Sequence, residues 1–199
     1  MLNDVLQAME NRRSVRMFDD KDIAEADIRI VLQAANHAPS AHNQQSWRFI
    51  VVRGAKKQEL AALAARRAAE FPKSSAALLR MAARSMSSAP VVIGVVNTGE
   101  LIRHGTDLLN LDRDSAADFF RTMEIQSSAA AVENLLLAAT SLGISSVWLG
   151  ALFLIKNEVL AVLEEPAGEF MAVVPLGYSE RMRAMPPKKS LEVKVKYLG

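Results

Sequence analysis

The chain has 199 residues, of which 50 % are apolar and 23 % charged, and its formal net charge is +2. This length suits one sizeable domain, and the composition is far from the low-hydrophobicity, high-charge signature of a disordered chain. The absence of cysteine excludes disulfides, thiol nucleophiles, iron–sulfur clusters and Cys-ligated zinc. With three histidines in the whole chain, no metal site is predicted.

Charge and hydropathy patterning also bound the partners and the location. Basic residues are scattered among 22 acids instead of being massed in one stretch, so neither nucleic acid nor a membrane surface is predicted as a partner. The N-terminus lacks the basic region and apolar run of a secretory signal. No window approaches the roughly 18 apolar residues of a membrane span. We therefore expect a cytoplasmic protein with a single domain over residues 1–199.

Helical and strand-like segments alternate along the chain. Apolar residues recur at the three- and four-residue spacing of a helix face in residues 3–12, 24–38, 57–84 (interrupted near Pro72), 121–142 and 157–163. Runs of β-branched and aromatic residues predict strands over 47–52, 90–97 and 171–176. This order of elements predicts a single α+β layer domain.

Four of these segments carry further information. The near-continuous β-branched run at 90–97 is typical of a strand buried on both faces. Residues 121–142 are apolar nearly all round, which indicates a helix buried in a core or at a subunit interface, and Gly143 stands where a left-handed cap residue belongs. The tail at 191–197 alternates like an exposed or partner-paired strand. Residues 98–117 are polar and irregular, and no element is assigned to them.

Common cofactor and catalytic motifs are absent. No G-x-G-x-x-G, Walker A, G-x-S-x-G or H-E-x-x-H sequence occurs, which disfavours a Rossmann site, a P-loop, a serine hydrolase and a zinc protease. Residues 110–121 begin like a calcium loop, but Ser115 and Arg121 replace its required glycine and glutamate. Residues 97–99 are also compatible with a flavodoxin-like phosphate loop, but a single Thr-Gly pair is a weak signal.

Two polar stretches remain as candidate sites. Residues 12–16, Arg-Arg-Ser-Val-Arg, place three guanidinium groups and a hydroxyl within five residues. Such groups bind phosphate well, and a solvated basic turn is the alternative interpretation. The loop at 39–45 offers amide donors and acceptors that suit a heterocycle, and it also suits an ordinary polar turn. Trp47 begins an apolar strand and is expected in the core.

Four motifs, met in order, resemble the nitroreductase family of FMN enzymes. They are R-R-S-V-R (12–16), A-P-S-A-H-N-Q-Q-S-W-R-F (38–49), A-A-V-E-N-L-L-L-A-A-T-S-L-G followed by V-W-L-G (130–143 and 147–150), and P-L-G-Y (175–178). The second is similar to the family's A-P-S-x-x-N-x-Q-P-W-x-F, with Ser46 in place of its proline. The resemblance covers nearly the whole chain. It implies an α+β nitroreductase-like fold, with a central, mostly antiparallel β-sheet flanked by helices, in a domain-swapped homodimer.

The resemblance also implies where FMN is held. Arg12, Ser14 and Arg13 would hold its phosphate and ribityl end. Arg16 would lie near N1 and O2 of the flavin, where a fixed cation stabilises the negative charge of the reduced state.

The remaining implied FMN contacts come from three other segments. Pro39, Ser40, Ala41 and Asn43 would come from the partner subunit and pack against the flavin ring. Trp148, Leu149 and Gly150 would border the ring, and the backbone of Leu149 and Gly150 would donate a hydrogen bond to N5. Among the late basic residues Arg183, Lys188 and Lys189, we expect Lys189 to contact the phosphate.

The implied activity is a ping-pong oxidoreductase reaction. Hydride would pass from NAD(P)H through flavin N5 to a small acceptor such as a nitroaromatic, a quinone or an enone, with water as a source of protons and no side chain assigned as catalytic. Residues 98–120, which line the substrate side in this family, match no motif, so the acceptor is not predicted. The alternatives are another FMN reaction on this fold (dehalogenation, heterocycle oxidation, flavin breakdown), a flavin carrier or sensor, and a plain oligomeric interaction domain.

Overall fold

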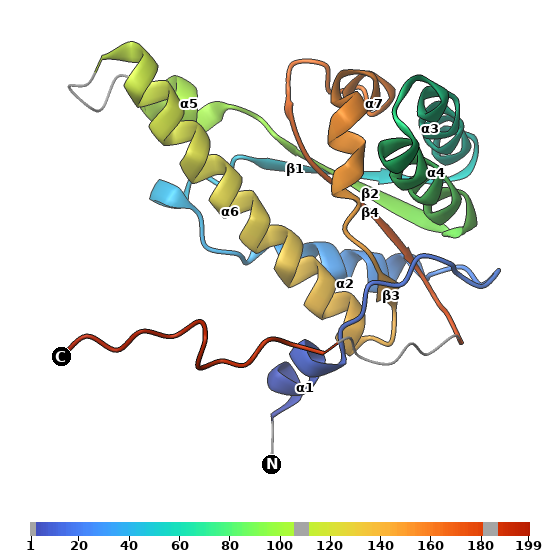
Figure 1. Ribbon diagram of the computed structural model, residues 1–199, viewed down its shortest axis with the longest axis horizontal. Coiled ribbons are helices and arrows are strands. Elements are labelled where there is room, and N and C mark those ends of the chain that lie inside the picture. The colour runs from blue at the N-terminus through green and yellow to red at the C-terminus, as the bar shows by residue number, and fades with distance from the viewer. Residues whose placement is uncertain (1–2, 106–111, 181–186) are drawn as a thin grey trace.

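A single antiparallel sheet forms the centre of the molecule. The computed structural model describes residues 3–105, 112–180 and 187–199. Its strands are β1 (Trp47–Val52), β2 (Val91–Asn97), β3 (Ser145–Ser146) and β4 (Glu169–Gly177), in the spatial order β1-β2-β4-β3 (Figure 1). Every residue of β2 is buried, which confirms the strand predicted to be covered on both faces.

Helices cover both faces of this sheet. They are α1 (Asp4–Asn11), α2 (Glu25–Asn36), α3 (Gly54–Arg67), α4 (Lys73–Ser88), α5 (Glu100–Gly105), α6 (Arg113–Ser141) and α7 (Lys156–Val162). Three 3₁₀ helices lie between them: η1 (Ala41–Asn43), η2 (Ala68–Glu70) and η3 (Gly150–Ile155). Figure 1 shows α2 and α6 on one side of the strands and α3, α4 and α7 on the other. The predicted α+β fold with a central antiparallel sheet flanked by helices is confirmed.

The alternation of β2 divides the core into two layers. Val92 and Val96 pack into the cluster formed with α3, α4, η3 and α7, whereas Val91, Ile93 and Val95 pack into the cluster formed with α2 and α6. Successive side chains of a strand point to opposite faces, so a run of β-branched residues can fill both layers at once.

The long helix α6 begins eight residues earlier than the sequence pattern predicts, at Arg113 instead of residue 121. Asp112 caps it, because its side chain accepts a hydrogen bond of 2.9 Å from the Ser115 amide. Gly143 has the left-handed φ of +71° expected of the residue that ends the helix. Within one protomer, α6 is less enclosed than predicted, since Leu137 and Ala138 are only half-buried.

The C-terminal tail differs from its prediction. Residues 187–199 form turns and extended backbone that leave the body of the molecule, and every one of them is exposed (Figure 1). No strand forms over the tail within this protomer. Alternation of apolar residues cannot by itself produce a strand, because a strand needs a neighbour that satisfies its backbone groups. Pairing of the tail with a partner subunit stays a prediction.

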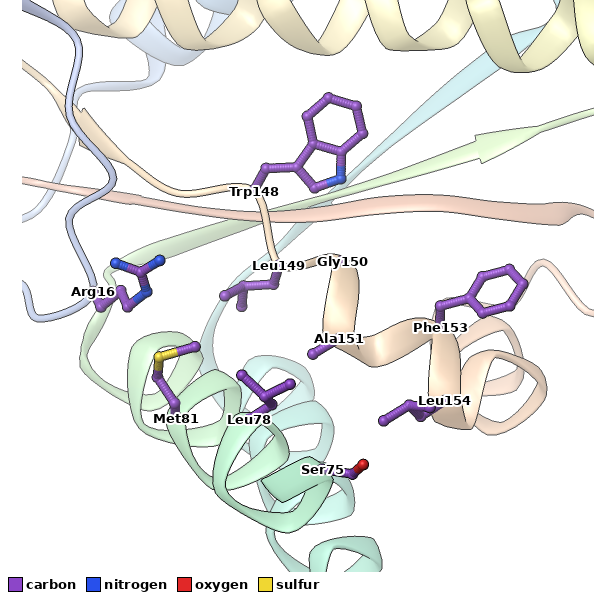
Figure 2. A pocket seen from close by; sticks show the side chains of 10 residues that line it. All are labelled: Arg16, Ser75, Leu78, Met81, Trp148, Leu149, Gly150, Ala151, Phe153 and Leu154. Carbon is purple, nitrogen blue, oxygen red and sulfur yellow. The ribbon is translucent and has the colours of Figure 1, made fainter. Parts of the chain in front are cut away.

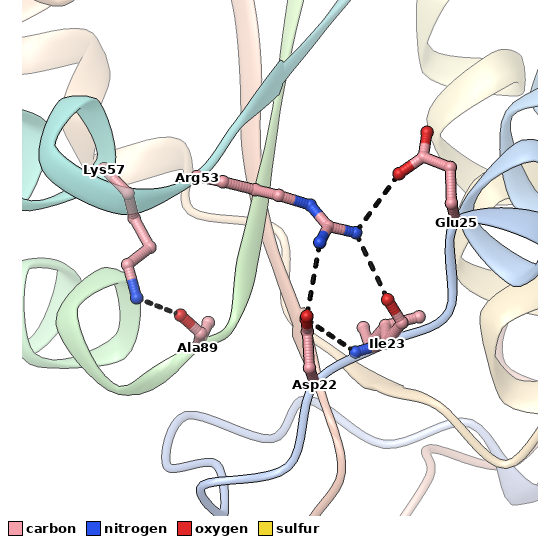
Figure 3. A network of polar contacts seen from close by, with 6 residues as sticks. All are labelled: Asp22, Ile23, Glu25, Arg53, Lys57 and Ala89. Carbon is pink, nitrogen blue, oxygen red and sulfur yellow. Dashed lines mark hydrogen bonds and ion pairs between the residues drawn. The ribbon is translucent and has the colours of Figure 1, made fainter.

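A polar network fastens the segment before α2 to the end of β1 (Figure 3). The Arg53 guanidinium lies 3.4 Å from the carboxylates of Asp22 and Glu25, and it donates a hydrogen bond of 3.2 Å to the Ile23 carbonyl oxygen. The two carboxylates are exposed, so these ion pairs contribute little free energy. Their effect is to hold the entry to α2 in register with the sheet.

Candidate functional site

A pocket of about 510 Å³ brings together residues from two of the predicted motifs. Arg16 lies on one side, and Trp148, Leu149 and Gly150 lie on another (Figure 2). The remaining lining residues come from α4 and η3: Ser75, Leu78, Met81, Ala151, Phe153 and Leu154. Residues more than 130 positions apart in the sequence therefore meet at one surface.

A short stretch of backbone pairing explains how the two motifs meet. Ser14 forms a parallel bridge with Ser146, and the Val15 amide donates a hydrogen bond of 3.0 Å to the Ser146 carbonyl oxygen. The chain that follows Ser146 continues along β4, because the Leu149 amide donates to the Val173 carbonyl oxygen at 2.9 Å. The basic cluster and the V-W-L-G motif are thus both fixed to the edge of the sheet.

Arg16 is the charged residue among those that line this pocket. Its side chain is half-buried, and its Nε atom is buried without a hydrogen-bond partner among the described residues. One Nη atom reaches the Ser14 carbonyl oxygen at the long distance of 3.4 Å. A guanidinium with so few protein partners has donor capacity left for a ligand, and the apolar walls around it strengthen its interaction with an anion.

The backbone at Gly150 offers a second donor. The Leu149 amide is already bonded to Val173, which removes it as a donor to a ligand. The Gly150 amide begins η3 and donates no backbone hydrogen bond within the described parts of the chain. A Cβ added at Gly150 would meet no atom within 4 Å, so the backbone here is open to close approach. Of the two amides predicted to face the flavin, only that of Gly150 can donate.

The other residues of the basic cluster do not line the pocket. Arg12 is the residue that ends α1. One Nη atom of Arg13 donates to the carbonyl oxygens of Glu10 (2.5 Å) and Arg12 (2.8 Å), so this side chain caps α1. Ser14 is exposed beside the bridge to Ser146. Their predicted contact with the FMN phosphate stays a prediction.

The predicted flavin-facing loop lies elsewhere in the protomer. The Ala41 amide donates to the Ser127 hydroxyl of α6 at 3.1 Å, and neither Pro39, Ser40 nor Asn43 lines the Arg16 pocket. Three residues of this loop that are not glycine have left-handed backbone conformations: His42 (φ 52°), Asn43 (φ 53°) and Gln45 (φ 52°). Such strain persists only where the surroundings hold it, and it is common in binding loops.

The predicted phosphate contact near the C-terminus is not brought to the pocket either. Lys188 and Lys189 are exposed in the tail, and Arg183 lies outside the described residues. Trp47, expected in the core, is buried there, and its Nε1 atom donates to the Asn36 side chain at 3.0 Å. Among the described residues, no group of three or more acidic or histidine side chains could hold a metal ion, and no helix is long and apolar enough to cross a membrane.

A sequence model described as the nitroreductase family matches residues 9–178. The chain belongs to the nitroreductase family. A protein of Archaeoglobus fulgidus named "Putative NADH dehydrogenase/NAD(P)H nitroreductase" is 32 % identical over 182 residues, which cover 89 % of this chain and 86 % of that protein. The resemblance stated from the four motifs is thereby confirmed.

Solved structures agree with this nitroreductase assignment. A BluB-like flavoprotein from Clostridium difficile 630 has a TM-score of 0.78 at 25 % identity, over 98 % of this chain and 99 % of that one. A nitroreductase with bound FMN from Bacteroides fragilis NCTC 9343 has a TM-score of 0.73 at 25 % identity, over the full length of both chains.

Several residues of this nitroreductase-family pocket were not predicted from the sequence. Leu78 and Met81 of α4 project toward the pocket in Figure 2, and Phe153 and Leu154 line it from η3. A usable signal existed for two of them, because Phe153 and Leu154 lie three and four residues after the V-W-L-G motif. Ser75, Leu78 and Met81 of α4 carry no such signal, since a helix rich in Ala and Leu shows where its core face lies but not what its other face borders.

Proposed function

We propose that this chain transfers a hydride from NAD(P)H, by way of bound FMN, to a small acceptor such as a nitroaromatic, a quinone or an enone. The more general prediction, an FMN-dependent oxidoreductase, is confirmed by the family assignment and by the FMN-bound neighbours. One observation carries the proposal furthest. Two under-used hydrogen-bond donors, the Arg16 guanidinium and the Gly150 amide, share a pocket that is otherwise apolar.

The chemistry of these donors fits a flavin. When bound, FMN supplies two-electron chemistry at its N5 position, between NAD(P)H and the acceptor. Arg16 would hold the N1–O2 edge of the ring and stabilise negative charge there. The Gly150 amide would donate to N5, and Leu78 and Met81 would exclude water from the ring. Arg12, Ser14 and Lys189 are proposed to bind the phosphate. No side chain is assigned as a proton donor to the acceptor.

We also propose a single domain over residues 1–199 that works as a homodimer, in which the loop of one subunit completes the pocket of the other. Exposed apolar surface supports the dimer. Val5, Leu6 and Met9 of α1 are each at least 44 % exposed. Next to them, a groove of about 500 Å³ between α1, α2 and α6 is lined by Leu137 and Ala138. A contiguous apolar surface of this kind marks a contact with another protein surface.

The proposed function is tested by the visible spectrum of the purified protein. Under anaerobic conditions, NADH and NADPH are added separately, and bleaching of the flavin absorbance is followed. A yellow protein that bleaches supports the proposal, and oxidised acceptors then restore the colour. A yellow protein that neither nucleotide bleaches supports a flavin carrier instead. A colourless protein that takes up no added FMN overturns the proposal.

A further inference from the structure

A buried carboxyl group lies beneath α5, away from the Arg16 pocket. Glu124, on α6, is 1 % exposed. Its Oε1 atom accepts a hydrogen bond of 2.8 Å from the Leu101 amide, at the start of α5. The Ile102 amide and the Ser46 hydroxyl also act on this carboxyl and lower its pKa. Three segments that are far apart in the sequence thus converge on one side chain.

The polar cluster around Glu124 is incompletely hydrogen-bonded. Four of its buried atoms make no hydrogen bond of normal geometry to the described residues: Ser46 Oγ, Asn97 Nδ2, Thr98 Oγ1 and Glu124 Oε2. Buried polar groups are normally hydrogen-bonded, so these four unpaired atoms lower the free energy of unfolding. Burial is the largest influence on the carboxyl and raises the pKa of Glu124 above its usual range.

Few charges act on this carboxyl. The Glu169 carboxylate, on β4, raises the pKa of Glu124 further, although Glu169 is itself paired with Arg121 of α6. On α5, Arg103 donates to the Thr98 carbonyl oxygen at 2.9 Å. Glu100 is in the first turn of that helix, and His104 is with Arg103 in its last turn. Among the described residues, the groups that shift the pKa of Glu124 include no cation.

The same face of α6 holds the flavin-facing loop. Ala41 packs against the cluster of Leu101, Ala116 and Phe120, and its amide bonds to Ser127. The His42 ring lies 6.5 Å from the Phe120 ring. Phe120, Glu124 and Ser127 are four and three residues apart, so they share one face of the helix. The loop ends at Ser46, whose carbonyl oxygen accepts a hydrogen bond of 3.0 Å from the Thr98 amide, three residues before the Leu101 amide that bonds to Glu124.

We propose that Glu124 is a positioning residue, which holds both the loop at 40–46 and α5 on one face of α6. In this role it fixes the geometry in which the loop meets the flavin, and it anchors α5 beside that loop. The inference rests on the proposed function for its consequence, and on the Leu101–Glu124 and Thr98–Ser46 hydrogen bonds for the anchoring itself. Glu124 does not line the Arg16 pocket.

Amide hydrogen exchange in the FMN-loaded, full-length protein tests the anchoring. Glu124→Leu keeps the bulk of the side chain but removes the carboxyl group, and with it the Oε1 atom that accepts from the Leu101 amide. We expect peptides from 40–46 and 98–105 to exchange at least about ten-fold faster, because the loss of a hydrogen bond to a charged group costs enough to open the segment more often. Peptides from α3 serve as an internal reference and are expected to keep their protection.

Two further variants separate anchoring from simple loss of stability. Glu124→Gln retains an acceptor for Leu101 and gains a donor for Ser46, so it is expected to restore slow exchange and the wild-type affinity for FMN. Ser128→Ala is the matched control, because Ser128 is 1 % exposed one turn further along α6 and bonds to Asn97, but to neither the loop nor α5. Its exchange in both segments is expected to equal that of the wild type.

Unchanged exchange of both segments in Glu124→Leu overturns the proposal, and so does an equal acceleration of the α3 peptides. If Glu124→Leu does not fold, the pH dependence of amide exchange is compared between the wild type and Glu124→Gln. After correction for the intrinsic rate, an inflection in the wild type that Glu124→Gln lacks supports the role of Glu124. The same inflection in both overturns it. Failure of the wild type to bind FMN overturns the proposed function, and the exchange of the wild type and the variants is then compared without FMN.

Discussion

The ammonium group of Lys57 donates a hydrogen bond of 2.5 Å to the main-chain carbonyl oxygen of Ala89 (Figure 3). A second bond of 3.3 Å reaches the Ser87 carbonyl oxygen. Both acceptors lie at the C-terminal end of α4, where the helix dipole favours a cation. Lys57 is only 9 % exposed, and burial lowers its pKa. A single lysine of α3 thus ties down the turn from α4 into β2.

Replacement of Lys57 by methionine is expected to lower the free energy of unfolding by about 2 kcal/mol, because two buried carbonyl oxygens lose a charged donor. Chemical denaturation monitored by circular dichroism measures the change. Lys56→Met is the matched control. Lys56 is 42 % exposed and makes surface ion pairs with Glu59 and Glu164, so its loss is expected to leave stability almost unchanged. Equal stability of the two variants would contradict the structural role of Lys57.

Replacement of Arg16 by alanine is expected to leave the fold intact and to weaken FMN binding by at least about ten-fold, since a charge-assisted bond in an apolar pocket is lost. The midpoint potential of any bound flavin is expected to fall, because the fixed cation no longer favours the reduced state. Flavin fluorescence and dye-coupled reduction measure the two effects. Arg29→Ala, at an exposed position of α2, is the control. Unchanged affinity and potential would remove Arg16 from the site.

Two substitutions at Gly150 separate its amide from its small size. Gly150→Ala retains the N–H group and meets no neighbouring atom, so flavin reduction is expected to proceed at nearly the wild-type rate. Gly150→Pro removes the donor at the first position of η3, where proline is tolerated by helical backbone. Stopped-flow reduction by NAD(P)H is expected to slow in the proline variant alone. Similar rates in both variants would mean that this amide does not act on the flavin.

Thermal unfolding between pH 4 and pH 8 tests the burial of Glu124. Its pKa is raised in the folded state, so the proton bound there stabilises the wild type at low pH, and this stability is lost as the pH rises through the folded pKa. Glutamine does not titrate. The melting temperature of Glu124→Gln is therefore expected to match the wild type near pH 4 and to exceed it at pH 7–8. A constant difference across this range would show that Glu124 titrates normally.

Mixing of two impaired variants, at an FMN concentration that leaves Arg16→Ala largely unloaded, tests whether the site is shared between subunits. In Arg16→Ala the pocket is damaged, and in Ser40→Tyr the loop is damaged. If each site uses Arg16 of one subunit and the loop of the other, an equal mixture is expected to recover about a quarter of the wild-type activity, because half of the dimers carry one intact site of two. Sites built within one subunit would recover none.

Local patterns predicted most of the elements, whereas long-range contacts decided the site. Strands β1, β2 and β4 were predictable because apolar runs of strand length reflect burial directly. The start of α6 was not, since its first turns are polar and depend on the Asp112 cap. Arg16 was found through its motif, but its bonding state depends on the bridge from Ser14 to Ser146, which no local pattern encodes. Glu124 gave no signal, because a glutamate on a helix is typical of the solvent face.

The hydrogen bond from the Leu149 amide to the Val173 carbonyl oxygen limits how substitutions can change the reactivity of a bound flavin. On the proposed assignment, the Gly150 amide donates to flavin N5. Its orientation is set by the sheet, because the preceding Leu149 amide is hydrogen-bonded to β4. No side-chain replacement can redirect it without displacing a strand. Variation between relatives, and any attempt at engineering, must therefore act on the opposite edge of the ring, where Arg16 and the apolar side chains of α4 can be exchanged one at a time.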